Sequence, residues 1–170
     1  SGIGLGIAQR VAGAGAKVVI CGRTLDKLEA AKQSIEEAGG ECHTYAVDLT
    51  DLNDCDKFID QVIADHGRVD ILVNNAGRSI RRAVEHSYDR FHDFERTMQL
   101  NYFSALRCTL RVLPGMSARK SGHIINISSM GVVGPPARFS AYVASKSALA
   151  GFTRCAETEY ADRNVHFCNI

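Results

Sequence analysis

A tyrosine and a lysine lie four residues apart, at Tyr142 and Lys146, and Ser129 lies thirteen residues before the tyrosine. Positions i and i+4 of a helix share one face, so the lysine ammonium would lie beside the phenol. A positive charge there favours the ionised phenol and brings proton transfer closer to neutral pH. A hydroxyl at Ser129 would hold the substrate oxygen. The spacing predicts a proton donor with the groups that tune it; the alternative is a surface helix that happens to carry a tyrosine and a lysine.

These side chains must be positioned by the surrounding elements, and short apolar runs alternate with helical patterns along the chain. The sequence predicts strands over residues 17–21, 42–47, 69–73, 123–127 and 165–170. It predicts helices over residues 5–14, 25–37, 52–66, 91–116 and 141–160, with Thr24 and Asp51 as N-caps. Strands that are apolar throughout are typical of parallel sheets buried on both faces. The alternation predicts an α/β fold with a doubly wound parallel sheet, in a single domain over residues 1–170.

Length and composition narrow the function classes. A chain of 170 residues, 45% of them hydrophobic, can bury one core, and the net charge of +1 argues against a nucleic-acid partner. No stretch reaches the roughly 18 to 20 apolar residues of a membrane span, and no signal peptide is recognisable. We therefore expect a soluble, cytoplasmic protein. The six cysteines lack paired spacing, which predicts buried, reduced thiols and no metal site.

The start of the chain and the end of the next strand suggest a dinucleotide. Ser1, Gly2, Ile3 and Gly4 lead directly into a helix, as a phosphate-binding turn would, although a glycine-rich start without a preceding strand is weak evidence. Arg23 follows the 17–21 strand, where a dinucleotide fold reads the adenosine ribose. No acidic residue is present there, and an arginine can pair with a 2′-phosphate. The pattern favours NADP over NAD; the alternative is a solvated arginine at a helix start.

Small or polar residues recur where two further strands end. Asp48 and Leu49 follow one strand, and Asn75, Ala76 and Gly77 follow the next. Ligands of open α/β sheets bind at these carboxyl ends. We expect Asp48 to accept a hydrogen bond from the adenine amino group, and the two small residues to let the backbone pass beside the cofactor ribose. Each residue taken alone is equally compatible with an ordinary turn.

Asn101 is a polar residue in an otherwise apolar helical pattern. Its neighbours Leu100, Phe103 and Leu106 are expected to face the core. A functional amide and an amide that merely satisfies nearby backbone groups are both compatible with this position.

Together these motifs resemble the short-chain dehydrogenase/reductase family over the whole chain. The resemblance rests on residues 2–6, Asp48, residues 74–77, Asn101, residues 128–129, Tyr142 and Lys146, in that order. It implies a Rossmann-type doubly wound sheet and nicotinamide chemistry with NADP(H). It further implies that Tyr142 is the catalytic acid and base and that Lys146 tunes it and binds the nicotinamide ribose. Ser129 would polarise the carbonyl, and Asn101 would hold a water that links Lys146 to solvent.

A narrower similarity covers residues 75–84, 89–103 and 138–146, which look like the bacterial fatty acyl-CoA reductase branch of the family. This similarity implies NADPH-dependent reduction of a fatty acyl-CoA to a fatty aldehyde. One alternative is a general ketone, 3-oxoacyl or hydroxysteroid-type dehydrogenase, and another is a non-catalytic NADP-binding regulatory module. Arg78, Arg81 and Arg82 would contact CoA phosphates or form a solvated basic loop.

The resemblance also implies elements outside the sequence. The family's first strand and first motif glycine are expected before Ser1, and its substrate-covering region after Ile170, so we expect the chain to be a fragment that is inactive alone. The strands around Val18 and Leu72 would then lack the partner that lies between them in the family. By family analogy we also expect a homodimer or homotetramer formed through the helices at 91–116 and 141–160.

Overall fold

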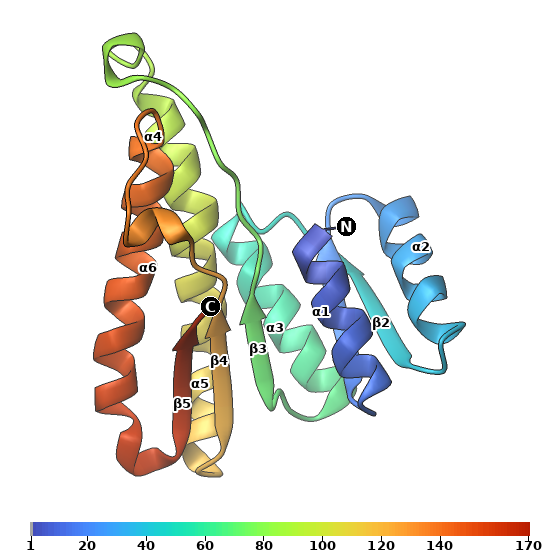
Figure 1. Cartoon of the computed structure of the whole chain (residues 1–170). Coiled ribbons are helices and arrows are strands. Elements are labelled where there is room, and N and C mark those ends of the chain that lie inside the picture. Colours follow the sequence, from blue (N-terminus) through green and yellow to red (C-terminus); the bar gives the residue numbers. More distant parts are fainter. Residues whose placement is uncertain (1) are drawn as a thin grey trace. The chain divides into compact units, whose positions relative to one another are not determined.

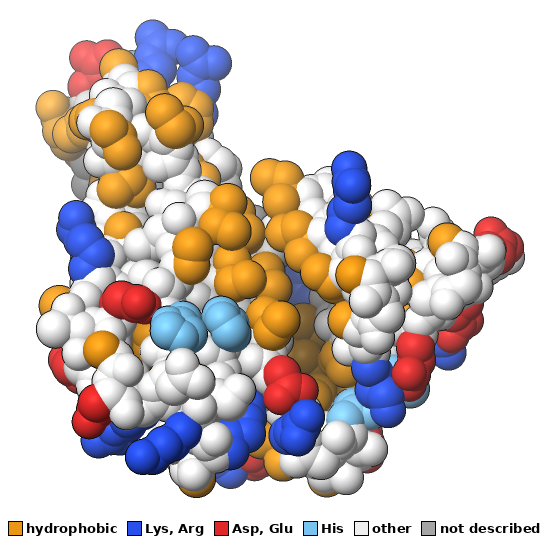
Figure 2. Space-filling view, turned by 60° about the horizontal axis from the view of Figure 1, so that its bottom comes forward, with side chains coloured by type: hydrophobic (Ala, Val, Ile, Leu, Met, Phe, Trp, Pro, Cys, Tyr) orange, Lys and Arg blue, Asp and Glu red, His pale blue; other side chains and the backbone are white. Residues whose placement is uncertain are grey.

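The computed structural model describes residues 2–170, which group into two compact units, Ser1–Leu49 and Thr50–Ile170 (Figure 1). Ser1, which the sequence predicts to contact the cofactor, lies outside the described residues. On the face shown in Figure 2, charged side chains of both signs are interspersed. Within residues 2–170, no helix is long and apolar enough to cross a membrane, and no three His, Cys, Asp or Glu side chains are grouped so that they could hold a metal ion.

The first unit is a two-stranded parallel sheet with two helices. Its elements in chain order are α1 (Gly2–Gly13), β1 (Lys17–Gly22), α2 (Leu25–Glu36) and β2 (Glu41–Ala46). The small core is formed by Ala8, Ala12, Val18, Ile35 and Cys42. A side chain at Gly40 would place its Cβ 2.7 Å from Ala12 Cβ and 2.9 Å from Ile35 Cγ2. Glycine there lets the turn into β2 close against both helices.

The second unit is a three-stranded parallel sheet in the order β3-β4-β5, with helices packed against it (Figure 1). Its helices and strands are α3 (Leu52–His66), β3 (Ile71–Asn74), α4 (Phe91–Met98), α5 (Ser104–Ala118), β4 (Gly122–Asn126), α6 (Ser140–Glu159) and β5 (Val165–Asn169). Short helical turns are η1 (Val84–His86), η2 (Gln99–Phe103), η3 (Met130–Val132) and η4 (Ala161–Arg163). Helix α5 packs on α3, β3 and β4, and α6 packs on β4 and β5. The predicted α/β class with parallel strands is confirmed, whereas the single domain stays a prediction.

The predicted elements are all present, with strand and helix ends within a few residues of those expected. The cap at Asp51 is confirmed, because its side chain accepts a hydrogen bond from the Asn53 backbone N–H at 2.8 Å. Thr24 is the N-cap residue of α2 as predicted, but its side chain makes no capping hydrogen bond.

The long helix predicted over residues 91–116 is interrupted by a π-helical turn, η2. A π turn holds more residues than an α turn, so it shifts which side chains face inward. Asn101 is completely buried, whereas Phe103 is 43% exposed. The prediction that Phe103 faces the core is therefore wrong.

The prediction of buried cysteines is correct for Cys42, Cys55 and Cys108 but wrong for Cys155 and Cys168, which are exposed free thiols. On β5, Val165 and Phe167 face the core, so the alternation of a strand turns Cys168 outward. On α6, Cys155 lies on the helix face opposite to its buried residues.

In the described part of the chain, β1, β2, β3 and β5 each have one open side, and β1 and β3 are the two that the sequence predicts to lack a partner. Across residues 2–170, β1 pairs only with β2, and β3 pairs only with β4. Ile71, the first residue of β3, is 54% exposed although it is apolar. The strands around Val18 and Leu72 thus each lack a second partner there, as the sequence predicts.

Candidate active site

Helix α6 carries Tyr142 and Lys146 on one side. The Lys146 side chain is buried, and its Nζ donates a hydrogen bond to the Ile127 carbonyl at 2.6 Å. Ile127 directly follows β4, so this hydrogen bond fixes the ammonium at the carboxyl end of a strand. Tyr142 is half-buried, and its ring meets the Phe139 ring edge-on, with centroids 6.4 Å apart. The lysine is thus anchored in the interior while the tyrosine ring stays partly accessible.

Burial lowers the pKa of Lys146 from its ordinary value of 10.5, because the charged ammonium is desolvated. Among the ion pairs within residues 2–170, none involves this lysine. An ammonium has three N–H donors, and the Ile127 carbonyl takes one of them. The ammonium thus has donors left that suit the hydroxyl groups of a ribose, and in this respect the site fits a nicotinamide cofactor.

The lowered pKa of Lys146 should make the free energy of unfolding depend on pH. An unfolded lysine keeps its proton up to about pH 10.5, whereas folded Lys146 loses it at a lower pH. Between these two pKa values the unfolded state binds more protons, so the free energy of unfolding rises with pH. We expect the wild type to gain stability relative to Lys146→Met as pH rises toward 10.5, measured by urea unfolding of the full-length protein. The difference in free energy of unfolding between the wild type and Lys27→Met, a substitution at an exposed position, is the control and should not change with pH. If the difference between the wild type and Lys146→Met does not change with pH either, the prediction is contradicted.

Asn101 holds two separate segments together. Its Oδ1 accepts a hydrogen bond from the Arg78 backbone N–H at 2.8 Å, and its Nδ2 donates to the Arg78 carbonyl at 2.9 Å. The same Nδ2 donates to Ser145 Oγ at 2.9 Å, and Ser145 Oγ donates to the Tyr142 carbonyl at 2.7 Å. The Asn101 amide therefore satisfies nearby backbone groups, which was one of the two interpretations of this residue, and it also joins Arg78 to α6. Ser145, next to Lys146 in the sequence, was not predicted to take part.

Gly77 lies against both Asn101 and Lys146. A Cβ at Gly77 would lie 3.2 Å from Asn101 Oδ1 and 3.6 Å from Lys146 Nζ. The structure thus brings together three of the predicted site residues from β3's exit, η2 and α6. Asn75 begins this exit with a tight turn, because its N–H donates to the Val73 carbonyl at 3.1 Å, and Ala76 links it to Gly77.

Ser129 begins the short turn η3, and its Oγ accepts a hydrogen bond from the Gly131 N–H at 3.1 Å. A hydroxyl that accepts in this way still has its own proton to donate, for example to a carbonyl oxygen. A Cβ at Gly131 would lie 3.2 Å from Val143 Cγ2 and 3.4 Å from Ser129 Oγ. The glycine therefore lets this turn lie against Val143 of α6.

A row of asparagine side chains crosses the sheet beneath these loops. Asn74, Asn126 and Asn169 end β3, β4 and β5 and lie in register. Asn74 Nδ2 donates to Asn126 Oδ1 at 2.8 Å, and Asn126 Nδ2 donates to Thr153 Oγ1 on α6 at 2.9 Å. Thr153 Oγ1 also lies 3.1 Å from Asn169 Oδ1. We call this set the amide ladder; the sequence signal for it was an asparagine at the end of each strand.

The first unit holds the remaining predicted cofactor residues. Gly2, Ile3 and Gly4 form the first turn of α1, where free backbone N–H groups and the helix dipole favour an anion. Arg23 follows β1 and Asp48 follows β2; the strands are parallel, so both exposed residues belong to the same edge of this sheet. Leu49, the last residue of the unit, is half-buried. The cofactor roles of these residues stay predictions.

Known proteins resemble the chain over nearly its whole length. The chain is 55% identical over 170 residues to a fatty acyl-CoA reductase of Acinetobacter baylyi, a match covering all of this chain and 58% of the relative. It is 42% identical over 167 residues to a fatty acyl-CoA reductase of Mycobacterium tuberculosis, which covers 98% of this chain and 57% of that relative. The chain thus spans about half the length of the curated relatives it matches.

Solved structures and a family model point the same way. A metagenomic short-chain oxidoreductase in complex with NADP superposes with a TM-score of 0.94 at 36% identity, covering 99% of this chain and 76% of that one. A xylitol dehydrogenase with bound NAD+ superposes with a TM-score of 0.90 at 32% identity, covering 97% of this chain and 63% of that one. The family model described as short chain dehydrogenase matches residues 1–170. The chain therefore belongs to the short-chain dehydrogenase family of oxidoreductases.

Proposed function

We propose that the protein reduces a fatty acyl-CoA to a fatty aldehyde with NADPH. The observation that carries this proposal is the buried ammonium of Lys146, fixed beside Gly77 and Asn101 on the helix that bears Tyr142. The relatives named fatty acyl-CoA reductase support the choice of substrate. Bound NADPH would supply the hydride.

The side chains of the second unit would manage the proton and the substrate oxygen. Ser129 donates its hydroxyl proton to the substrate carbonyl, since the hydrogen bond that its Oγ accepts from the Gly131 N–H leaves that proton available. Tyr142 donates its phenolic proton to the oxygen as negative charge develops there. Lys146 stabilises the resulting phenolate and binds ribose hydroxyls. Asn101 positions Ser145 and the Arg78 backbone, and we assign to it the water that links Lys146 to solvent.

For a thioester the atoms balance without a covalent enzyme intermediate. Hydride adds to the carbonyl carbon, and the carbonyl oxygen takes the proton of Tyr142. The C–S bond then breaks as the oxygen returns its proton to the tyrosine and reforms the double bond, and the CoA thiolate takes a proton from solvent. The products are an aldehyde, free CoA thiol and the oxidised cofactor.

We propose cofactor contacts in each unit by position in the family pattern. In the first unit these are Ser1, Gly2, Ile3 and Gly4 for the pyrophosphate, Arg23 for the 2′-phosphate, and Asp48 and Leu49 for the adenine. In the second unit they are Asn75, Ala76, Gly77, Tyr142 and Lys146 for the nicotinamide ribose. The exposed guanidinium of Arg23 and the helix start at Gly2 support the phosphate assignments.

Arg23 gives the choice of NADP over NAD a direct test. We expect Arg23→Ala to weaken NADPH binding about 10- to 100-fold, because a charge-assisted hydrogen bond to a phosphate contributes about 1.5 to 3 kcal/mol. NADH lacks the 2′-phosphate, so its dissociation constant should stay the same. Both constants can be measured by nicotinamide fluorescence in the full-length protein. Arg10→Ala, on the exposed part of α1, is the control, and equal losses for the two cofactors would contradict the assignment.

The function itself is tested by following NADPH oxidation and thiol release together, with a long-chain acyl-CoA and the full-length protein. One thiol released per NADPH oxidised supports the proposal. Oxidation only with ketones or 3-oxo compounds would replace it with a general carbonyl reductase, an alternative favoured by a TM-score of 0.92 to a 7α-hydroxysteroid dehydrogenase. Tight NADPH binding without turnover on any carbonyl would indicate a regulatory binding module.

A further inference from the structure

A cleft with a basic lining opens in the second unit, outside the residues assigned to catalysis. Its volume is about 370 Å³, within the range of small-molecule sites. The residues that line it are Arg81, Arg82, Ala83, His86 and Arg138. The Arg82 backbone N–H donates to the Arg138 carbonyl at 2.7 Å, which joins the two loops that form the cleft. Among these five lining residues, three are arginines and none carries a carboxylate.

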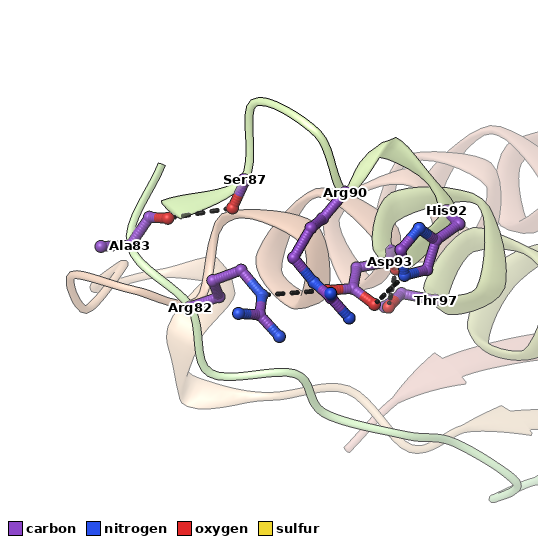
Figure 3. A network of polar contacts seen from close by, with 7 residues as sticks. All are labelled: Arg82, Ala83, Ser87, Arg90, His92, Asp93 and Thr97. Carbon is purple, nitrogen blue, oxygen red and sulfur yellow. Dashed lines mark hydrogen bonds and ion pairs between the residues drawn. The ribbon is translucent and has the colours of Figure 1, made fainter. Parts of the chain in front are cut away.

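One of these arginines, Arg82, is already paired with a carboxylate inside the protein. Asp93 is buried at the start of α4, and its carboxylate lies 3.0 Å from Arg82 Nε, 3.3 Å from Arg90 Nε and 3.3 Å from His92 Nε2 (Figure 3). Burial raises the pKa of Asp93, but hydrogen bonds from Arg82 and Arg90 outweigh this effect and lower the pKa overall. The carboxylate is therefore ionised at neutral pH. Arg82 thus holds the loop in place through the carboxylate that it shares with Arg90.

The other two arginines of the lining are not paired in this way. Within residues 2–170, neither Arg81 nor Arg138 forms an ion pair with a carboxylate. The Arg81 guanidinium lies over the Phe139 ring at 5.9 Å from its centroid, which fixes its direction. Arg138 has a φ of 72°, in the left-handed region that residues other than glycine rarely adopt. Two guanidinium groups without carboxylate partners in the lining of one cleft suit a phosphate, which arginine binds in a bidentate manner.

The cleft is connected to the candidate active site through one aromatic ring. Phe139 contacts both the Arg81 guanidinium and the Tyr142 ring, and the centroids of the two rings are 6.4 Å apart. Arg138 lies only four residues before Tyr142. A ligand whose reacting carbonyl lies at Tyr142 and whose charged end is carried on a flexible arm can therefore place that end near these arginines.

We propose that this cleft binds a phosphate group of the CoA portion of the substrate, with Arg81 and Arg138 as its donors. The proposal rests on the proposed acyl-CoA reductase function. It assigns Arg82 to the loop rather than to the ligand, and it adds Arg138 from the segment before α6. The acyl chain and thioester carry no charge, so these two arginines would distinguish the CoA ester from smaller thioesters.

The test compares two thioesters of the same fatty acid, acyl-CoA and acyl-N-acetylcysteamine, which lacks all phosphates. In the full-length protein, Arg81→Gln and Arg138→Gln should each lower kcat/KM for acyl-CoA about 10-fold relative to kcat/KM for the short thioester. Arg154→Gln, at an exposed position of α6, is the matched control and should leave the ratio unchanged. A ratio unchanged in both cleft variants would overturn the proposal.

A second measurement separates the cleft from the catalytic function. Desulfo-CoA cannot react, and at saturating NADPH it should inhibit reduction of a neutral ketone in the wild type, with an inhibition constant about 10-fold weaker in each cleft variant. This result would support the phosphate site even if acyl-CoA were not reduced, in which case only the proposed function would fail. No inhibition by desulfo-CoA, or equal inhibition of the wild type and both cleft variants, would overturn the phosphate site.

Discussion

Replacing Tyr142 by phenylalanine is expected to lower kcat for carbonyl reduction by about 100- to 10,000-fold, the usual contribution of a positioned proton donor. The substitution removes only the phenolic O–H. The ring and its edge-on contact with Phe139 are kept, so α6 should stay in place, and NADPH affinity should remain close to that of the wild type. Single-turnover kinetics and fluorescence titration of NADPH measure these two quantities separately.

Tyr160→Phe is the matched control for this experiment. Tyr160 follows the same helix, and its ring contacts Arg163 and Phe167, away from Lys146. It should retain wild-type turnover. If Tyr142→Phe also retains full turnover, the tyrosine has no part in the chemistry, and the assignment of the proton donor must move to another group.

Asn101→Ala should have the largest effect on stability and a large effect on turnover. The side-chain amide of Asn101 forms hydrogen bonds with the backbone N–H and carbonyl of Arg78 and with Ser145 Oγ. Leaving buried polar groups unpaired costs about 1 to 3 kcal/mol each, so we expect a loss of about 3 kcal/mol in the free energy of unfolding. Because the same amide positions the chain beside Gly77 and Lys146, we also expect a loss of about 100-fold in kcat.

Gln99→Ala is the comparison for that substitution, since Gln99 lies in the same π turn but donates to the Thr50 carbonyl on the other side, at 2.9 Å. It should cost about 1 kcal/mol or less, with little change in kcat. Urea unfolding and steady-state kinetics on the three proteins give the answer. If the Asn101→Ala protein is as stable and as active as Gln99→Ala, the hydrogen bonds between Asn101 and the Arg78 backbone are unimportant.

The alternating elements could be predicted because each leaves a local signal. Helix α3 is the clearest case, since Asp51 caps its start and Gly67, with a φ of 84°, ends it. The order of the catalytic motifs was also readable, because the family resemblance depends on residue types at fixed spacings. The structure then places Gly77, Asn101 and Lys146 together as that resemblance implies.

What could not be predicted depends on partners distant in the sequence. The π turn at Gln99–Phe103 lies inside a continuous helical pattern, so its hydrophobic periodicity gave no sign of it. Likewise, Arg81 and Arg82 look alike in sequence, and only the position of the buried Asp93 decides that Arg82 is the one with a carboxylate partner. The expected homo-oligomer stays a prediction.

The amide ladder bears on how the sheet of the second unit reaches the correct alignment. Asn74 can bond to Asn126, and Thr153 can bond to both Asn126 and Asn169, only when β3, β4 and β5 are in register. A shift of one residue would turn each side chain to the opposite face of the sheet, and Asn126, which is fully buried, would lose both of its partners. Misaligned pairings are thereby penalised while the chain folds, so the row that supports the candidate active site also acts as a check on strand alignment.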